Sequence, residues 1–355
     1  MKTFYKKVLL YIFPAIAALI LSACSKDNTP VEPDEQNDYT NIIAGFADNV
    51  ALSTYGDLDT KAGALNAAAT AYLNTPTQEN LNAACEAWKA TRAPWESSEA
   101  FLFGPVEYLS LDPSMDSWPL DKAQLDEILK SNYELTPEFI KDGLGPTLRG
   151  FHTLEYLLFS DGQPRNTADI TNREKQYLAA AAQVLAGDAH SLHTSWSESF
   201  AAEFKNAGKS GSRYNSQVQA VQEMIEGMIG IADEVGNGKI SDPYKSKDVL
   251  SVESWYSWNS LTDFQNNIRS IENAYTGKYQ NGTSTAGLSD FIKAKNPELD
   301  TKVKTEITAA ITAIDAIPHP FRNNLNANAQ IDAAVKACNI LMTTLNSEVK
   351  AIITN

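Results

Sequence analysis

The sequence predicts an all-helical fold arranged as two helical bundles. Apolar residues recur every three or four positions along long, alanine-rich stretches, which is the pattern of amphipathic helices. Strand-type alternation is hard to find, and the apolar runs that a parallel sheet needs are absent. The 332 residues after position 23 exceed the size at which one core usually keeps growing, so two domains are expected.

Residues 1–23 are predicted to be a targeting signal and not part of the fold. Three lysines precede an apolar stretch, and small residues lead up to Cys24. The tetrapeptide LSAC, residues 21–24, resembles a bacterial lipobox. Cys24 is therefore expected to be the first mature residue and to carry lipid, which anchors the chain to a membrane without spanning it. An ordinary cleaved secretory signal is the alternative.

Residues 24–38 are predicted to form a disordered tether, because they are acidic, contain two prolines and hold almost nothing apolar. Loss of residues 1–23 removes three lysines and no acidic residue, so the formal charge changes from −15 to −18. Such acidity argues against nucleic acid and anionic lipid as partners. The acidic tether fits a protein displayed on the outer membrane of a Gram-negative cell.

The two predicted bundles cover residues 39–165 and 166–355. Thr77 is a suitable N-cap, and Pro94 predicts a kink in the helix that follows. Residues 104–146 hold five prolines and are expected to be largely irregular, a kind of segment that often carries function. The helical patterns, in chain order, cover residues 38–73, 77–102, 121–132, 146–159, 172–207, 213–235, 254–275, 297–317 and 327–353.

Two cysteines remain after Cys24, namely Cys85 and Cys338. Each lies in an amphipathic helical pattern among alanines and aliphatic residues. A cysteine in such a place usually behaves as a small buried hydrophobe, so both are predicted to be unpaired structural thiols.

The hexapeptide GFHTLE, residues 150–155, is the strongest candidate for a metal site. It places His152 three residues before Glu155, and residues at this spacing share one helical face with Cβ atoms about 5–6 Å apart. Borderline divalent metals accept a mixture of imidazole nitrogen and carboxylate oxygen. A hydrogen-bonded or solvated pair is the alternative, and two ligands do not complete a site.

Residues 88–105 form a second polar and aromatic segment. Trp88, Arg92, Trp95 and Glu99 fall on one face of the predicted helix. The alternative is a core stripe in which Arg92 and Glu99 reach solvent or pair with each other.

Residues 251–268 form a third such segment. Glu253, Ser257 and Ser260 share one face of the predicted helix, with Asp263 beside it. Serine disfavours helices and is costly to bury without partners, so this face indicates either a polar pocket wall or an exposed surface.

The remaining histidines are weaker candidates. His190 and His193 are three residues apart on an alanine-rich helix and are expected to be exposed, so they are rejected as the main site. His319 lies in a proline-flanked loop that could line a pocket.

Together these segments resemble the imelysin family, also classed as peptidase family M75, over about residues 39–350. Gly150, His152 and Glu155 match its GxHxxE signature. Residues 88–105 match its W-x3-R-x2-[YW]-x3-E segment with a downstream FGP, and residues 253–263 match its ESxxSxxSxxD block. The resemblance implies two helical bundles with the signature near their interface. It also implies a cell-envelope role in iron acquisition, with other iron-uptake proteins of the envelope as partners.

This resemblance leads to a first hypothesis, a lipid-anchored protein that binds iron or another divalent metal. Iron suits a mixed imidazole and carboxylate set, and zinc or calcium are the alternatives. His152 and Glu155 are the expected ligands, with Glu99 or Glu253 completing the set. The residues expected to orient these ligands or to line the pocket are Arg92, Trp88, Trp95, Ser257, Ser260 and Asp263.

Two other functions stay open. A zinc peptidase would use Glu155 as ligand or general base and a metal-bound water as nucleophile. The HExxH and HxxEH motifs of such enzymes need a second histidine, however, and position 156 is a tyrosine. The third possibility is a binding module for haem, a glycan or a partner lipoprotein, with aromatic residues such as Trp88 and Trp258 as its surface.

Overall fold

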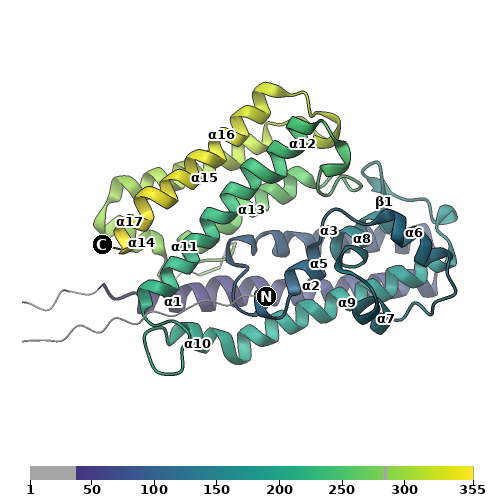
Figure 1. Cartoon of the computed structure of the whole chain (residues 1–355), viewed down its shortest axis with the longest axis horizontal. Coiled ribbons are helices and arrows are strands. Elements are labelled where there is room, and N and C mark those ends of the chain that lie inside the picture. The colour runs from purple at the N-terminus through teal and green to yellow at the C-terminus, as the bar shows by residue number, and fades with distance from the viewer. Residues whose placement is uncertain (1–36, 281, 284–285, 355) are drawn as a thin grey trace, which may run out of the picture. The chain divides into compact units, whose positions relative to one another are not determined.

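Helices α2 (Leu52–Asn74) and α9 (Asn172–Ser195) are the longest in the computed structural model, and they pack side by side (Figure 1). The structure describes residues 37–280, 282–283 and 286–354. Within them, the only strands are β1 (Phe159–Ser160) and β2 (Gln163–Pro164), which pair as an antiparallel hairpin. The predicted all-helical class is therefore confirmed.

The first half of the chain follows the predicted helices closely up to Glu96. The Thr77 hydroxyl accepts a hydrogen bond from the Asn80 backbone, which confirms the N-cap. Pro94 lies in the last turn of α3, which ends sooner than predicted. The other helices of this half are α1 (Thr40–Gly45), η1 (Phe46–Ala51), α3 (Gln78–Glu96), η2 (Glu99–Phe101), α4 (Pro105–Tyr108), α5 (Leu111–Asp116), α6 (Lys122–Lys130), α7 (Pro137–Gly143), η3 (Pro146–Leu148), α8 (Gly150–Leu158) and η4 (Thr167–Asp169).

The second half is also helical, with π-helical turns (η5, η6, η9) joining several segments. Its elements after α9 are η5 (Trp196–Phe200), α10 (Ala201–Lys205), α11 (Gln217–Asp233), η6 (Glu234–Ile240), α12 (Ser241–Ser246), η7 (Val249–Ser251), α13 (Ser260–Thr276), α14 (Leu288–Lys295), α15 (Pro297–Asp315), η8 (Phe321–Asn323), α16 (Asn328–Thr344), η9 (Leu345–Val349) and α17 (Lys350–Thr354).

The predicted helix over residues 254–275 is wrong at its start, because α13 begins only at Ser260. Ser254 and Trp258 have positive φ angles of 52° and 63°, which a right-handed helix does not allow. The Ser260 hydroxyl donates to the Glu253 carbonyl at 2.6 Å, and serine side chains that bond nearby backbone in this way compete with helix formation. Glu253 and Ser257 therefore reach the site from a turn, and not from a helical face.

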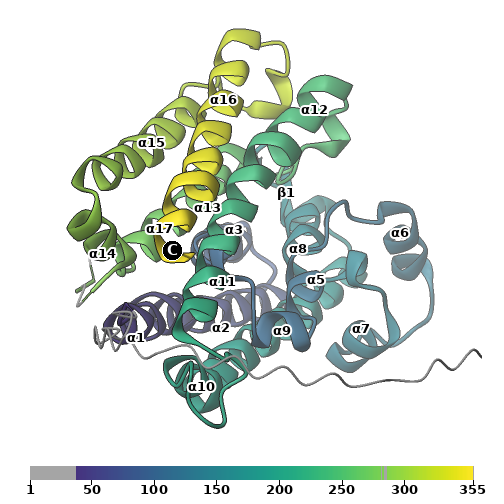
Figure 2. The ribbon, with the colours of Figure 1, turned by 60° about the vertical axis from the view of Figure 1, so that its left-hand side comes forward.

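Two groups of helices are visible in both ribbon views (Figures 1 and 2). Helices α11, α13, α15 and α16 pack together, while α2, α3 and α9 form the other group. In the sequence, α9 comes after the predicted domain boundary between residues 165 and 166. It nevertheless packs along α2, which comes before that boundary. Residues Asp38–Asn355 form one compact unit, and the two-domain boundary stays a prediction.

Both cysteines of the folded part are unpaired and buried, which confirms the prediction for Cys85 and Cys338. Burial raises the pKa of each thiol to about 12. The predicted signal at residues 1–23, the lipidation site Cys24 and the tether up to residue 36 lie outside the described residues.

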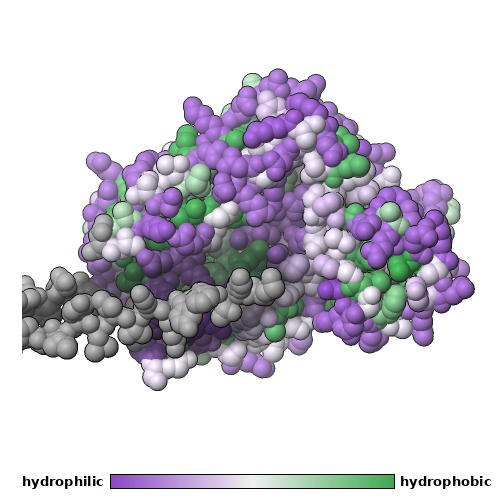
Figure 3. All heavy atoms as spheres, viewed as in Figure 1, coloured by the Kyte–Doolittle hydropathy of each residue, from purple (hydrophilic) through white to green (hydrophobic). Residues whose placement is uncertain are grey.

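One face of the described chain is mostly polar. Apart from the grey atoms, the face in Figure 3 is mostly hydrophilic, in keeping with a formal charge of −15. None of the helices in the described ranges is long and apolar enough to cross a bilayer.

Candidate metal centre

The imidazole of His152 is fully buried near the start of α8. Its Nδ1 atom lies 3.1 Å from Glu155 Oε2. Its Nε2 atom lies 3.1 Å from Asp116 Oδ1 and 3.6 Å from Glu253 Oε1. Nε2 is nevertheless outside hydrogen-bonding geometry with every described residue. The result is a buried imidazole nitrogen that faces two carboxylates and has no hydrogen bond of its own.

Glu155 lies on the other side of this imidazole. Its Oε1 atom accepts hydrogen bonds from both the backbone N–H and the hydroxyl of Ser257, each at 2.8 Å. Both carboxylate oxygens therefore have partners, and Glu155 fixes the orientation of His152 through Nδ1. Metal-binding histidines commonly donate their other ring N–H to a carboxylate in this way. Direct ligation by Glu155, as the sequence predicted, would break contacts that the structure shows.

Gly150 brings the start of α8 against the end of α5. It has a φ of +80°, in the region that favours glycine. A Cβ atom at this position would lie 2.2 Å from the backbone oxygen of Met115. The close approach places Asp116, the last residue of α5, beside the His152 ring. The glycine of the GxHxxE signature is thus required by the geometry of the site.

Two tryptophans hold Asp116 and His152 in place. Trp95 Nε1 donates to Asp116 Oδ2 at 2.6 Å, which leaves Oδ1 on the side of the imidazole. The Trp118 ring packs edge-on against His152, with ring centroids 4.7 Å apart. The predicted pocket residue Trp95 is therefore in direct contact with the site, whereas Trp88 donates to the Phe151 carbonyl at 3.0 Å and supports α8 from behind.

Arg92 lies at the centre of the acidic cluster and is fully buried. The segment is a core stripe, as the alternative held, since Trp88 and Trp95 are also fully buried, but Arg92 neither reaches solvent nor forms an ion pair with Glu99. The guanidinium forms ion pairs with four carboxylates. One lies a single turn along the same helix α3, and the other three lie on other elements that only the fold brings together. These partners are Glu96 (2.5 Å), Glu253 (2.6 Å), Asp263 (3.3 Å) and Asp116.

Lys239 supplies the second cation of the cluster from the π-helical turn η6. Its ammonium lies 2.9 Å from Glu253 Oε2 and 3.9 Å from Glu96 Oε2. Burial alone would raise the pKa of Glu253, but Lys239, His152 and Arg92 together lower it to about 2. Glu253 is thus ionised at neutral pH, as a metal ligand must be. Burial opposes protonation of His152, but Asp116, Glu155 and Glu253 raise its pKa well above the usual range, so a metal ion bound at Nε2 would have to displace a proton.

The cluster holds more carboxylates than cations. Burial raises the pKa of Glu96 to about 8 and that of Asp263 to about 6, despite the nearby Arg92. Burial also raises the pKa of Glu99 well above its usual range, and this carboxylate is only 9% exposed. Opposing charges hold the pKa of Asp116 below its ordinary value, because Arg92 and His152 outweigh the effect of burial. An additional cation would therefore be stabilised here.

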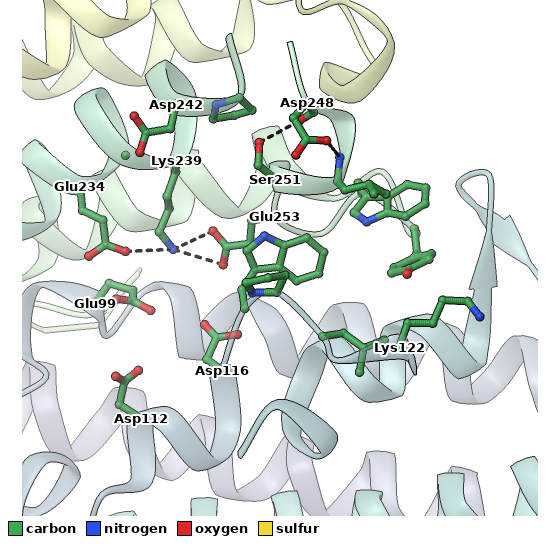
Figure 4. Close-up of a pocket in the computed structure, with 18 of the residues that line it drawn as sticks. Glu99, Asp112, Asp116, Lys122, Glu234, Lys239, Asp242, Asp248, Ser251 and Glu253 are labelled. Carbon is green, nitrogen blue, oxygen red and sulfur yellow. Dashed lines mark hydrogen bonds and ion pairs between the residues drawn. The ribbon is translucent and has the colours of Figure 1, made fainter. Parts of the chain in front are cut away.

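Glu99, Asp116, Lys239 and Glu253 of this cluster line a cavity of about 760 Å³ (Figure 4). Its wall combines aromatic and apolar side chains, among them Trp118, Trp255 and Tyr256, with charged ones. Carboxylates outnumber amines in this wall, and the labelled acidic side chains surround Lys239 in Figure 4. The charged lining residues are Glu99, Asp112, Asp116, Glu234, Asp242, Asp248, Glu253, Lys122 and Lys239.

Four carboxylates and one histidine could hold a divalent cation in two overlapping groups that share Asp116. One ligand atom each from Asp116, His152 and Glu253 lie within 4.8 Å of one another. The same holds for Glu96, Glu99 and Asp116. The sequence offered Glu99 and Glu253 as carboxylates that complete the site. The structure places Glu253 beside His152, whereas Glu99 lies in the second group, with Glu96 and Asp116.

The other predicted residues occupy supporting positions. Asp263 pairs with Arg92, Ser257 bonds Glu155 and Ser260 bonds the Glu253 carbonyl. His319 is exposed and does not line the cavity.

Sequence reasoning missed Asp116, Trp118 and Lys239. The first two lie in the proline-rich segment 104–146, whose irregular character was a signal for function. Lys239 follows the GNG stretch at residues 236–238 and carried no recognisable motif.

These features define an all-helical protein with a buried histidine and carboxylate cluster at the base of a cavity, the kind of site that holds a metal ion. Residues 51–347 match the sequence profile of imelysin, peptidase family M75. This match covers most of the chain, so the protein belongs to the imelysin family.

Individual relatives agree with this assignment. The chain is 28% identical over 313 residues to iron-regulated protein A of Synechococcus elongatus, covering 87% of this chain and 82% of that protein. A solved structure from Parabacteroides distasonis, described as a proposed iron-regulated protein A precursor, is 38% identical with a TM-score of 0.83, covering 91% of this chain and 96% of that one. An imelysin-like protein from Psychrobacter arcticum shares the fold, with a TM-score of 0.70 at 12% identity over 86% of this chain and 92% of that one.

Proposed function

We propose that this protein binds a divalent metal ion, with iron favoured, through Asp116, His152 and Glu253, and that it assists iron acquisition at the cell envelope. The observation that carries the proposal is Nε2 of His152, a buried nitrogen without a hydrogen bond that faces two carboxylate oxygens. Imidazole with carboxylate suits iron and other borderline divalent metals. The iron-regulated relatives of this chain favour iron among these metals.

The surroundings of the three residues fit such a site. Glu155 holds the His152 ring so that Nε2 faces Asp116 and Glu253, two carboxylates that line the cavity. A buried polar atom without a partner is costly, and a metal ion at this place would satisfy it. When bound, the metal would supply a compact positive charge that the excess of buried carboxylates stabilises.

Arg92 has a compatible role, since it pairs with the same two carboxylates that face His152. A carboxylate has about four lone-pair sites on its two oxygens and accepts more than one partner. The guanidinium therefore keeps Asp116 and Glu253 close together and limits their mutual repulsion. It orients the ligand set and still leaves the imidazole nitrogen without a hydrogen bond.

The acidic cavity also restricts the form in which a metal can enter. Its charged lining is dominated by carboxylates, with Lys122 and Lys239 as the only amines among the described lining residues. A field of this sign attracts free cations and repels anionic complexes. We therefore expect the protein to take up the aquated ion and not a metal held by an anionic chelator such as citrate.

Anaerobic calorimetry with Fe(II) and Zn(II) tests the metal site. The suitable protein is the metal-stripped chain from Ser25 onward, because it contains the whole compact unit Asp38–Asn355. His152→Ala is expected to remove one equivalent of bound metal, since it deletes the only nitrogen ligand of the set. Glu155→Gln should lower the affinity for this metal ion by about 10–100-fold, the usual effect of losing the carboxylate that hydrogen-bonds a ligating histidine.

His319→Ala is the matched control, because His319 is exposed and does not line the cavity. It should bind metal like the unmodified chain. If His152→Ala and His319→Ala bind the same number of ions with the same affinity, the proposed site is wrong.

Attachment to the membrane through a lipid on Cys24 belongs to the same proposal, and the lipobox-like sequence LSAC supports it. In cells, Cys24→Ser is expected to move the protein from the membrane fraction to the soluble fraction, or to leave it with an uncleaved signal. Cell fractionation with labelled palmitate distinguishes these outcomes. Unchanged membrane association without incorporated lipid in the native chain would contradict the anchor.

A further inference from the structure

Lys239 contacts the same carboxylate oxygen that faces His152. Its ammonium donates to Glu253 Oε1 at 3.2 Å and lies 2.9 Å from Oε2. Oε1 is also the oxygen that lies 3.6 Å from His152 Nε2. A metal ion held by His152 and Glu253 would bind this oxygen. The ion and the ammonium therefore compete for one carboxylate.

Of the two permanent cations in the cluster, Lys239 is the one that can move. Arg92 is fully buried and is fixed by ion pairs with four carboxylates. Lys239 instead carries a compact charge on a flexible four-carbon stem, and its side chain is 10% exposed and lines the cavity. It belongs to η6, and π-helical turns of this kind are frequent at functional sites.

The cavity offers the ammonium of Lys239 other acidic partners. Glu234 lies 3.7 Å from it, and the Glu234 side chain is 55% exposed. Glu99 also lines the cavity, is only 9% exposed and forms neither an ion pair nor a hydrogen bond with any described residue. Figure 4 shows the Glu234 carboxylate on the opposite side of the ammonium from Glu253, with Glu99 nearby. The ammonium can therefore leave Glu253 and keep a carboxylate beside it.

We infer that Lys239 is an internal counter-cation, which pairs with Glu253 while the His152 centre is empty and moves toward Glu234 and Glu99 when a divalent ion binds. This inference rests on the proposed metal site. An ammonium beside a divalent ion repels it, and the repulsion is strong where burial lowers the effective dielectric constant. Lys239 thus lowers the affinity of the site and favours release. Reversible binding suits a protein that hands its metal on.

Calorimetry with Zn(II) on the metal-stripped chain from Ser25 onward tests this role. Lys239→Met keeps a long, flexible apolar side chain and removes the charge. It is expected to raise the Zn(II) affinity of the His152 centre by at least about 10-fold, because the repulsion between ammonium and ion is lost. Glu253 stays in place through its ion pair with Arg92 at 2.6 Å. Damage to the fold would lower the affinity, so the sign of the change separates the two effects.

Two lysine variants serve as controls. Lys239→Arg keeps the charge and should bind Zn(II) no more tightly than the unmodified chain. Lys122→Met removes the other amine of the cavity lining, whose side chain is 51% exposed and pairs with Asp126. It should change the affinity by less than about twofold, because water and salt screen an exposed charge.

The rate of zinc release to an added chelator gives a second readout. Release should be slower from Lys239→Met than from the unmodified chain, and the tightly bound ion should disappear when His152→Ala is added. If Lys239→Met matches Lys122→Met in affinity and release rate, the inference is wrong while the metal site stands. If His152→Ala removes no bound metal, the metal site itself is wrong and this inference fails with it.

Discussion

Replacing Arg92 with leucine is expected to lower the free energy of unfolding by about 3–5 kcal/mol, because it removes one partner of a buried ion-pair network. Arg92 is fully buried and pairs with four carboxylates. Without it, Lys239 is the remaining permanent cation in the cluster, and it reaches Glu253 but lies farther from Glu96. Carboxylates that stay buried must then remain unpaired or take up protons.

Urea denaturation followed by circular dichroism measures this loss. Arg213→Leu is the matched control, because Arg213 forms an ion pair with Glu203 while its side chain is 44% exposed. Exposed pairs contribute at most about 1 kcal/mol. The loss of unfolding free energy in Arg92→Lys should fall between the losses in the two leucine variants, since lysine keeps the charge but lacks the planar fork that contacts several carboxylates. Similar unfolding midpoints for Arg92→Leu and Arg213→Leu would contradict the central role given to Arg92.

Divalent metal should restore part of the stability of Arg92→Leu. A ligand that binds only the folded state at 100 times its Kd adds about 2.7 kcal/mol. Because Asp116 and Glu253 lose the guanidinium that limits their mutual repulsion, a metal ion at the His152 centre would take over that part of its role. The stabilisation by Zn(II) should disappear when His152→Ala is added. Its persistence would place the bound ion elsewhere.

Gly150→Ala is expected to destabilise the protein by about 2–5 kcal/mol and to abolish metal binding at His152. Alanine at a φ of +80° costs about 1–2 kcal/mol. The added Cβ would also lie 2.2 Å from Met115 O and 2.8 Å from Ser114 O, and relieving such overlap costs about 1–3 kcal/mol more. The contacts are backbone atoms, so α5 and α8 must separate. That movement takes Asp116 away from the imidazole.

Gly63→Ala is the control for this prediction. Gly63 lies within α2, and a Cβ atom there would have no heavy atom within 4 Å. Alanine at an exposed helical position is expected to stabilise by about 0.5–1 kcal/mol. Thermal unfolding and Zn(II) calorimetry on both variants measure the two effects. If Gly150→Ala has the same unfolding temperature and zinc affinity as Gly63→Ala, the close approach of α5 and α8 is not needed for stability or for metal binding.

Most helices were predictable because their signals are local. Periodic apolar residues and caps such as Thr77 act within a few turns, and the structure reproduces α2, the start of α3, α9 and α15 to α17 within a few residues. The start of α13 was not predictable in this way. Its turn depends on the Ser260 hydroxyl bonding the Glu253 carbonyl and on Ser257 bonding Glu155, and the second of these partners is 102 residues away.

The candidate site was predictable only in part, for a similar reason. Spacing placed His152 and Glu155 on one face, and the structure does bring them into contact. Spacing could not show that Glu155 would face Nδ1 while Asp116 faces Nε2. Asp116 and Lys239 lacked a motif, since their role comes from their neighbours in space.

The sequence by itself determined the helical class, the family resemblance, the buried thiols and the His152 signature. Each of these follows from residue types at short spacing, where backbone geometry fixes the outcome. Only the tertiary structure decided which carboxylates meet His152, that Arg92 joins four of them, and that Asp59 pairs with His190 and His193. Apart from the pair of Arg92 with Glu96 one turn along α3, those contacts link distant segments, and the free energy of burying charge favours them only after the helices have packed.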